Sequence, residues 1–328
     1  MRLTLGTVLF SCLLSAEQQV LLVLLKGANA LGYYTMDGQP VAKVAVGEHP
    51  HEMVLSTDGR YAYITDNGVM RIENAGRGGN TVSVVDIAAK KRVDTIGLGR
   101  NRRPHGISLD PVTGRLAVTS ESPDGLVLLD GLRRRVLKRF ETGGNTSHMV
   151  AFGPGKSGAE YAYVSNSGSG DISVVQLTTG ELKLLPAGRR PEGSVLSRDG
   201  KLLYVCNRES DTITVIDTER RGVVGEIKTG RGPVRIAATP DGRMLIYACM
   251  HGRYIEFTDL EVRRPVARIP VKGDPISLNI SPDGKLAFAS VEELDTVYVI
   301  SVPDRKLVKT FQVEKGFGPD PVMMATIP

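Results

Sequence analysis

A block of about 40 residues recurs along this chain of 328 residues, and this repetition restricts the possible folds more than any other feature. Each copy opens near a proline, continues through a turn such as STDG or SPDG, and then alternates apolar and polar residues in strings such as YAYITDN and TVSVVDI. Asp-Gly turns between alternating runs predict β-hairpins. The copies begin at Pro50, Pro104, Ser147, Pro191, Pro233, Pro275 and Pro321.

Each complete copy contains four predicted strands, rich in Val, Ile, Thr and Tyr, and no long segment has helical periodicity. Such repeats are typical of propeller blades, which pack face to face around an axis. The chain ends supply one more blade: 20–25, 32–36 and 40–47 match second, third and fourth strands, and 321–328 matches a first strand. We therefore predict an all-β, seven-bladed β-propeller of four-stranded blades, closed by pairing of the N- and C-terminal strands.

The repeat also carries a family resemblance. The strings YITDN, YVSNS and LYVCN, followed by NTVSVVDI and DTITVIDT, resemble the YVTN-type β-propeller repeat family of secreted and surface-layer-like proteins. The resemblance covers nearly everything after residue 20 and implies the propeller fold. Similar repeats occur in archaeal surface-layer proteins, secreted bacterial binding proteins and respiratory enzymes such as nitrous oxide reductase, and related propellers include lactonases. The resemblance therefore leaves the function open.

The first 16 residues, MRLTLGTVLFSCLLSA, have the arrangement of a secretory signal peptide, with one arginine, an apolar run and small residues at its end. Lipidation of Cys12 after a lipoprotein-type signal, and an uncleaved start, are the alternatives. We expect residues 17–328 to form a single propeller domain, located in the periplasm or outside the cell. No later run reaches the roughly 18 apolar residues of a transmembrane helix.

The composition restricts the partners. The net charge is +5, but aromatic residues make up only 5% and tryptophan is absent, so we expect no specific nucleic-acid partner. Cys206 and Cys249 occupy equivalent positions of neighbouring repeats and are expected to pack as small apolar residues, with a disulfide as the alternative. We expect a monomer whose partner is a small molecule, a peptide or an envelope protein.

Three of the five histidines occupy the same position, just inside the first strand of consecutive repeats. They are His51, His105 and His148, and Glu192 occupies the position in the next repeat. Because first strands line the channel of a propeller, these side chains are predicted at one channel mouth. Three interpretations are open: contacts with the backbone at the start of the strand, a ligand site without metal, and a divalent metal site at His51, His105 and His148. We expect no other cofactor.

Other polar residues are predicted on the same face of the ring. An insertion at 68–80, GVMRIENAGRGGN, brings Arg71 to this face, and the loop 100–103 brings Arg103, which could attract an anion. Glu121 and Arg208 follow the ends of second strands on this face. The candidate ligand-binding residues are His51, His105, His148, Glu192, Arg235, Arg103, Arg71, Asn166 and Asn207.

No catalytic motif of the GxSxG, HExxH or P-loop type occurs, and no CxxCH haem-attachment motif occurs. The first hypothesis is therefore an exported binding or scaffold protein of the cell envelope. The alternative is a lactonase-like hydrolase or lyase, with or without a metal, in which His105 or His148 acts as general base and Glu192 positions it or helps to bind a divalent ion. A second alternative, from the resemblance alone, is an accessory to a periplasmic quinone- or copper-dependent oxidoreductase.

Overall fold

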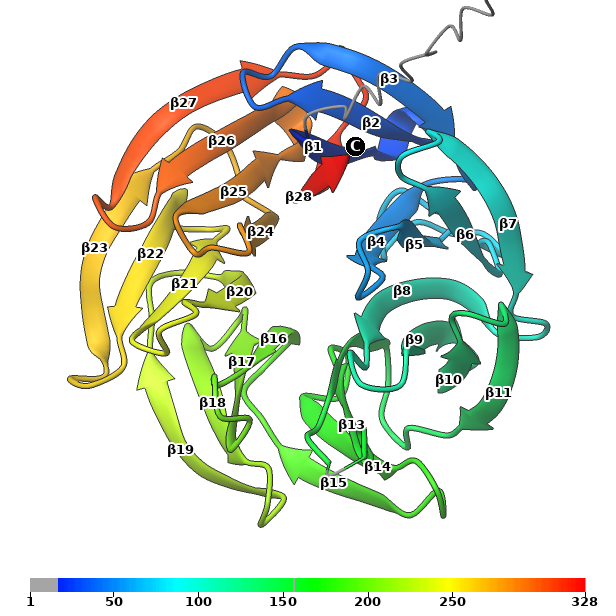
Figure 1. Ribbon diagram of the computed structural model, residues 1–328. Helices are drawn as coiled ribbons and strands as arrows, with labels where there is room; N and C mark the ends of the chain where they lie inside the picture. Colours follow the sequence, from blue (N-terminus) through cyan, green and yellow to red (C-terminus); the bar gives the residue numbers. More distant parts are fainter. Residues whose placement is uncertain (1–16, 156, 328) are drawn as a thin grey trace, which may run out of the picture.

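Seven four-stranded antiparallel sheets surround a central channel (Figure 1). The computed structural model describes residues 17–155 and 157–327. The proposed signal peptide and Cys12 lie outside these residues. Two short 3-10 turns, η1 (Lys26–Ala28) and η2 (Glu292–Leu294), are the helical elements of the described part, and it contains no helix long and apolar enough to cross a membrane. The predicted seven-bladed propeller is confirmed.

The blades are numbered 1 to 7 around the ring, and blade 1 joins the two ends of the chain. The inner strands of blades 1 to 7 are β28 (Pro319–Ile327), β4 (Pro50–Leu55), β8 (Arg102–Leu109), β12 (Ser147–Phe152), β16 (Pro191–Leu196), β20 (Pro233–Ala238) and β24 (Ser277–Ile280). The second strands are β1 (Gln18–Leu25), β5 (Tyr61–Asp66), β9 (Arg115–Ser122), β13 (Tyr161–Asn166), β17 (Leu202–Asn207), β21 (Met244–Cys249) and β25 (Leu286–Val291).

The chain continues outward through two further strands in each blade. The third strands are β2 (Ala30–Thr35), β6 (Thr81–Asp86), β10 (Asp124–Asp130), β14 (Asp171–Gln176), β18 (Thr212–Asp217), β22 (Tyr254–Asp259) and β26 (Thr296–Ser301). The outer strands are β3 (Pro40–Ala45), β7 (Lys91–Gly97), β11 (Arg135–Phe140), β15 (Leu182–Pro186), β19 (Gly222–Lys228), β23 (Arg264–Pro270) and β27 (Lys306–Gln312).

Blade 1 closes the ring as the two terminal fragments predict. Strand β28 from the C-terminus pairs antiparallel with β1, with Val20 opposite Ala325 and Leu22 opposite Met323. Figure 1 shows the red β28 against the dark blue β1, at the junction of the first and last blades. This pairing leaves no open edge inside blade 1.

The hydrophobic core lies between neighbouring blades. Tyr63 and Val84 of blade 2, for example, are buried in one cluster with Val118 and Val127 of blade 3. The predicted packing of both cysteines is confirmed, since Cys206 and Cys249 are free and buried. The blades therefore form a rigid ring, and the side chains that line its channel are held by their inner strands.

The inner strands are irregular at the end where the histidines lie. The register between inner and second strands shifts between Pro50 and Met53 and between Pro104 and Ile107. Shifts of the same kind occur in blades 4, 5 and 6. A bulge of this kind changes the direction of the side chains within it. His51, His105, His148 and Glu192 all lie in these irregular segments, which is why the repeat brings them to one mouth.

Hydroxyl groups of second strands fix the bulges to the next blade. The N–H of Gly106 donates to Thr119 Oγ1, and Thr119 Oγ1 donates to the carbonyl oxygen of His148, each at 2.8 Å. Thr65 donates in the same way to the carbonyl of His105 at 2.8 Å. The backbones approach closely here, since a Cβ at Gly106 would lie 2.6 Å from the His148 carbonyl oxygen. The histidine backbones are thus held by hydrogen bonds between blades.

Candidate functional site at the histidine mouth

The predicted residues of the bulges meet at one end of the channel, which we call the histidine mouth. His51, His105, His148 and Glu192 are all buried and line a cavity of about 530 Å³. Residues from the terminal blade and from the insertion complete its wall. The other lining residues are Lys26, Met70, Arg71, Ile72, Glu73, Arg208, Val234, Arg235, Met250, His251, Asp274, Ile276, Glu292, Glu293 and Asp320.

The three imidazoles form a continuous row. The ring centroids of His51 and His105 are 4.5 Å apart, and those of His105 and His148 are 3.8 Å apart. Burial, together with the charge of Lys26, holds the pKa of His51 well below its usual value. Burial and the neighbouring His148 do the same to the pKa of His105. Both imidazoles are therefore neutral at physiological pH.

His148 differs because two carboxylates flank its ring. Its Nε2 lies 2.9 Å from Glu192 Oε2, and its Nδ1 lies 3.5 Å from Glu121 Oε1. Burial by itself lowers the pKa of His148, but Glu192 and Glu121 outweigh burial and raise this pKa to about 9. Burial raises the pKa of Glu192, but His148 and Arg208 outweigh it and bring this pKa to about 2. His148 is thus an imidazolium paired with an ionised glutamate in the metal-free protein.

An ion pair crosses the channel below the imidazoles. Arg235 of β20 reaches Glu52 of β4, with 2.6 Å between Nη2 and Glu52 Oε1. Its Nη1 lies 3.6 Å from Glu192 Oε2. Strands β4 and β20 belong to opposite sides of the ring (Figure 1). The guanidinium therefore ties blades 2, 5 and 6 together and forms the floor of the histidine mouth.

A second charged group comes from the composite blade. The ammonium of Lys26 lies 3.0 Å from Glu292 Oε2 and 3.7 Å from Asp320 Oδ2. Burial raises the pKa of Asp320, although Lys26 opposes this effect. Asp320 Oδ1 is buried without a hydrogen-bond partner among residues 17–155 and 157–327. Blade 1 thus adds a buried lysine and the carboxylate of Asp320 to the wall of the cavity, and Glu292 comes from the neighbouring blade 7.

The insertion at 68–80 covers one side of the histidine mouth, on the face where its position in the repeat predicts it. The carbonyl of Val69 lies 3.1 Å from His51 Nε2. Arg103 Nη2 donates to the carbonyl of Ile72 at 2.7 Å, and Arg102 donates to the carbonyl of Gly78 at 3.0 Å. The insertion is therefore bound to the body of the ring.

Comparisons with known proteins agree with this architecture. A model described as "Lactonase, 7-bladed beta-propeller" matches residues 69–263, which is more than half of the chain. The chain belongs to this family. A curated relative is Protein NirF of Pseudomonas aeruginosa, 33% identical over 117 residues, which cover 35% of this chain and 29% of NirF. The match thus spans less than a third of NirF.

Solved structures share the fold at low sequence identity. Hydrazine synthase of Kuenenia stuttgartiensis has a TM-score of 0.71 at 20% identity and covers 84% of this chain and 90% of its own. A functionally unknown protein of Desulfotomaculum acetoxidans DSM 771 has a TM-score of 0.76 at 12% identity, covering 94% and 99%. Dihydro-heme d1 dehydrogenase NirN in complex with DHE has a TM-score of 0.64 at 18% identity, covering 92% and 74%. These similarities establish the fold alone.

Some sequence candidates of this family member lie outside the cavity. Asn166 and Asn207 are fully buried within their blades and donate to hydroxyls of Ser173 and Thr214, so they hold neighbouring strands together. Arg103 binds the insertion and does not line the cavity. These three residues thus make contacts within the fold and do not line the cavity. Arg71 and Arg235 do line the cavity, as expected.

The structure also adds residues that the repeat pattern did not single out. Glu52 follows His51 directly, and Lys26 and Asp320 lie in the two halves of the composite blade, where the block is interrupted. The metal trio is altered as well. Among the described residues, donor atoms of His105, Glu121 and His148 lie within 4.8 Å of one another, and His51 is not part of this group. The sequence did contain one signal for Glu121, which is its position at the end of a second strand, on the face predicted for the histidines.

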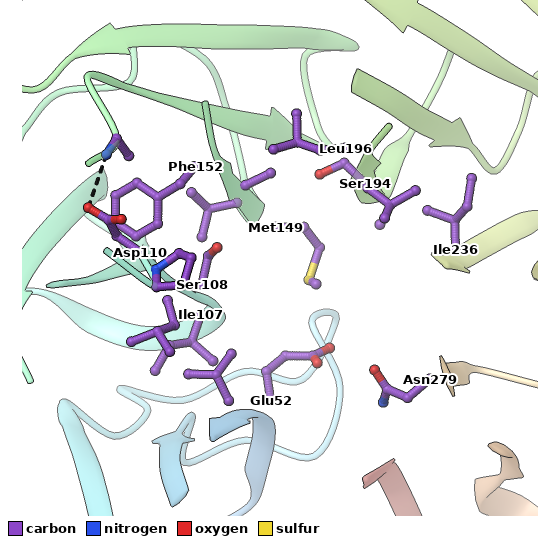
Figure 2. A pocket seen from close by; sticks show the side chains of 18 of the residues that line it. Glu52, Ile107, Ser108, Asp110, Met149, Phe152, Ser194, Leu196, Ile236 and Asn279 are labelled. Atoms are coloured by element: carbon purple, nitrogen blue, oxygen red, sulfur yellow. Dashed lines mark hydrogen bonds between the residues drawn. The ribbon is translucent and has the colours of Figure 1, made fainter. Parts of the chain in front are cut away.

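The opposite end of the channel has a different character, and we call it the turn mouth. It holds a cavity of about 590 Å³ beside the Asp-Gly turns. Figure 2 shows Met149 and Asn279 facing its open centre, with Ile107, Phe152 and Ile236 around it. Arg235 lines both cavities. The ion pair of Arg235 with Glu52 therefore lies between the two mouths.

Proposed function

We propose that this protein is a binding protein whose histidine mouth holds a small organic anion. The cavity supports this proposal, because it combines charged side chains of both signs with apolar ones at the mouth of a rigid ring. Lys26, Arg208 and Arg235 are partly balanced by glutamates. Arg71 makes no ion pair with any other described residue. The Arg71 guanidinium is thus available for a carboxylate of the ligand.

Binding without turnover fits the protonation of the imidazoles. A general base must be neutral, within reach of the substrate and oriented by a third group. His148 has the orienting carboxylate, Glu192, but its pKa is raised to about 9, so it already carries the proton. His105 is neutral, but its Nδ1 has no partner among the described residues. Neither histidine combines both requirements.

The second candidate is a lactonase-like hydrolase, and the family match favours it. In this version, His105 would take a proton from the water that attacks the lactone carbonyl, and Arg235 or Arg208 would stabilise the developing oxyanion. The ring C–O bond would then break as His105 returns the proton to the leaving oxygen. A bound lactone would have to supply the orientation that His105 lacks. The two candidates share the cavity and differ in whether the ligand is consumed.

Calorimetric titration with three probes tests both candidates. The probes are gluconate as an organic acid, gluconolactone as a lactone, and iron protoporphyrin IX as a carboxylate-bearing tetrapyrrole, the last because NirN was solved with DHE. Binding of at least one probe is expected, and Arg71→Ala should weaken it about 10-fold or more. Arg77→Ala is the matched control, since Arg77 belongs to the same insertion but does not line the cavity.

Failure of all three probes to bind, or equal losses in Arg71→Ala and Arg77→Ala, would contradict a ligand site at the histidine mouth. Consumption of gluconolactone by the wild type, abolished in His105→Gln, would replace the binding proposal with the lactonase-like one. An accessory role beside an oxidoreductase predicts instead a stable complex with a second protein, which co-purification would show.

We also propose that the protein is exported to the periplasm or beyond and acts as a monomer. The arrangement of residues 1–16 supports export. Cell fractionation of the full chain and of a variant lacking residues 2–16 tests this. Export predicts that only the full chain leaves the cytoplasm, and sedimentation of the purified protein would give its oligomeric state.

A further inference from the structure

Three buried polar atoms lie together at the junction of blades 3 and 4 without hydrogen-bond partners. They are His105 Nδ1, His148 Nδ1 and Glu121 Oε1, and none has a partner among residues 17–155 and 157–327. A ring nitrogen of each histidine and a carboxylate oxygen of Glu121 lie within 4.8 Å of one another. A buried polar atom without a partner costs about 1–3 kcal/mol, so three in one place require an explanation.

An ion pair between His148 and Glu121 is not a sufficient explanation. Their nearest atoms are 3.5 Å apart and do not form a hydrogen bond, although both side chains are buried. Such a pair would also leave His105 Nδ1 unsatisfied, because no carboxylate faces it at hydrogen-bond distance. One group that accepts lone pairs from all three atoms would satisfy them together, and a metal ion does this.

The distance of 3.5 Å suits two ligands of one ion. With bonds of about 2.0–2.1 Å, a tetrahedral zinc ion separates its ligand atoms by about 3.3–3.4 Å. The ring centroids of His105 and His148 are 3.8 Å apart with the rings tilted by 40°, and a ring nitrogen of each lies within 4.8 Å of a carboxylate oxygen of Glu121. The three side chains come from a bulge of β8, the end of β9 and a bulge of β12, which the interblade hydrogen bonds hold in place.

The surroundings of the cluster have the form of a metal site. Glu192 Oε2 lies 2.9 Å from His148 Nε2, on the opposite side of the ring from Nδ1. A carboxylate that accepts the second ring N–H orients a metal-bound histidine and increases its basicity. Arg103 Nε lies 3.3 Å from Glu121 Oε2, so a guanidinium holds the other oxygen of that carboxylate. The two outer partners leave Nδ1 and Oε1 directed toward each other.

We propose that His105, Glu121 and His148 bind a divalent transition-metal ion, zinc by the chemistry of the donors. Two imidazoles and one carboxylate form a ligand set found at catalytic zinc sites, which keep one further position open. His105 and His148 line the cavity of the histidine mouth, so the open position faces the cavity and accepts an oxygen of a bound molecule. The metal site does not depend on the proposed organic ligand, because zinc alone occupies it.

The test is a titration of zinc, in the absence of any organic ligand, into full-length protein treated with a chelator and dialysed. Competition with a chromogenic chelator should give one tight site per chain. Glu121→Gln and His105→Gln, which keep the size of the side chain, should each weaken zinc binding at least about 100-fold. Glu192→Gln should weaken it about 10- to 100-fold, as expected for an outer partner.

His51→Gln is the matched control, because His51 occupies the same position of the neighbouring repeat and is equally buried. Its zinc affinity should stay within about threefold of the wild type. Zinc should also raise the melting temperature of the wild type and of His51→Gln, but not that of Glu121→Gln. Cobalt in the same site should give the absorption of a tetrahedral complex.

Three outcomes would overturn the proposal: no zinc binding by the wild type, undiminished binding in Glu121→Gln, and an equal loss in His51→Gln. None of them affects the organic-anion proposal, which depends on Arg71. Conversely, loss of probe binding in Arg71→Ala with unchanged zinc affinity would separate the two sites. Circular dichroism of each variant shows whether the fold is intact.

Discussion

The two mouths of the channel are built from opposite ends of the same inner strands, yet they differ in almost every chemical respect. The histidine mouth surrounds its cavity of about 530 Å³ with buried histidines, glutamates and arginines. The turn mouth surrounds a slightly larger cavity, about 590 Å³, with side chains such as Met149, Ile107 and Ile236 (Figure 2). The larger cavity therefore has few charged side chains, which are Glu52, Asp110 and Arg235, whereas charged side chains and histidines make up most of the wall of the smaller one.

The backbone explains this difference. At the histidine end the inner strands of blades 2 to 6 are bulged, so His105 and His148 turn toward the channel from irregular segments. Further along the same strands the pairing is regular, with Ile107 opposite Val118 and Phe152 opposite Ala162. Regular strands alternate their side chains and bury apolar ones between the blades. The Nδ1 atoms of His105 and His148, which have no partner among the described residues, thus lie where the bulges interrupt this alternation.

Loss of the ion pair between the mouths should have the largest effect. Arg235→Met leaves Glu52 buried without its cation, and we expect the free energy of unfolding to fall by about 3–5 kcal/mol. Chemical denaturation at pH 7, followed by circular dichroism because the chain has no tryptophan, measures this.

The double variant Glu52→Gln with Arg235→Met removes both charges of that pair and is the matched control. It should recover much of the lost stability, since a pair replaced by neutral groups leaves no isolated charge there. A double variant no more stable than Arg235→Met would show that Arg235 acts through packing and that the two mouths are not separated by an ion pair.

At the turn mouth, the contribution of Phe152 to stability should come from apolar packing. Phe152 belongs to the core between blades 3 and 4 and also borders the cavity (Figure 2). Phe152→Ala should lower the free energy of unfolding by about 3 kcal/mol. Met149→Ala, on the same strand but facing the open channel, should lower it by less than about 1 kcal/mol.

Zinc affinity provides the second measurement for these two variants. Because the turn mouth contains no part of the proposed metal site, Phe152→Ala and Met149→Ala should bind zinc as the wild type does. A loss of zinc affinity in Met149→Ala would mean that the two ends of the channel are coupled through β12.

The repeat was sufficient to predict the blades, the closure by the terminal strands and the end of the channel where His51, His105, His148 and Glu192 meet. Strand periodicity and Asp-Gly turns are local signals, and each copy reinforces the others. The partners of these residues were not predictable in the same way. Whether Glu121 or His51 joins His105 and His148 in one cluster of donor atoms depends on how a bulge rotates each side chain, and the repeat pattern carries no record of that rotation.

Asn166 and Asn207 show a different limit of the repeat pattern, because it does not distinguish a polar residue at a site from one inside a blade. Asn166 and Asn207 occupy the position of Asp66, at a face where function was expected, and the sequence alone does not show that they point into their own blades. Their hydrogen bonds to strand hydroxyls explain why this position is polar in blades 2, 4 and 5. A polar residue that recurs in a repeat can thus form the same structural hydrogen bonds in each blade, and its recurrence does not by itself indicate a binding site.

Asp66 allows the smallest and most selective prediction about the histidine end. Burial raises its pKa to about 6, although Thr81, Ser83 and the N–H of Gly47 donate to its carboxylate. At the turn mouth, burial also acts on Asp110, but its hydrogen bonds, one of them from the N–H of Ala159, outweigh burial and lower its pKa (Figure 2). Of these two aspartates, Asp66 is therefore the one whose ionisation destabilises the fold.

The sign follows from the raised pKa. The folded state holds the Asp66 proton more tightly than the unfolded state does, so protonation of Asp66 contributes to the stability of the fold. This contribution to stability is complete below about pH 4 and is lost as the pH rises through about 6. Asp66→Asn removes the titration and retains hydrogen bonds to Thr81, Ser83 and Gly47. The free energy of unfolding of the variant minus that of the wild type should therefore be at least about 1 kcal/mol larger at pH 7.5 than at pH 4.

The reverse exchange in blade 4 is the control. Asn166→Asp would place a carboxylate beside Asp171, whose Oδ1 now accepts a hydrogen bond from Asn166 at 2.6 Å. That variant should lose stability, and the loss should increase as the pH rises from 4 to 7.5, because both carboxylates then ionise. Denaturation curves at both pH values measure the two effects. The difference in free energy of unfolding between Asp66→Asn and the wild type could instead stay constant with pH. That result would mean that Asp66 is ionised throughout this range and that its hydrogen bonds fully compensate the cost of burying its charge.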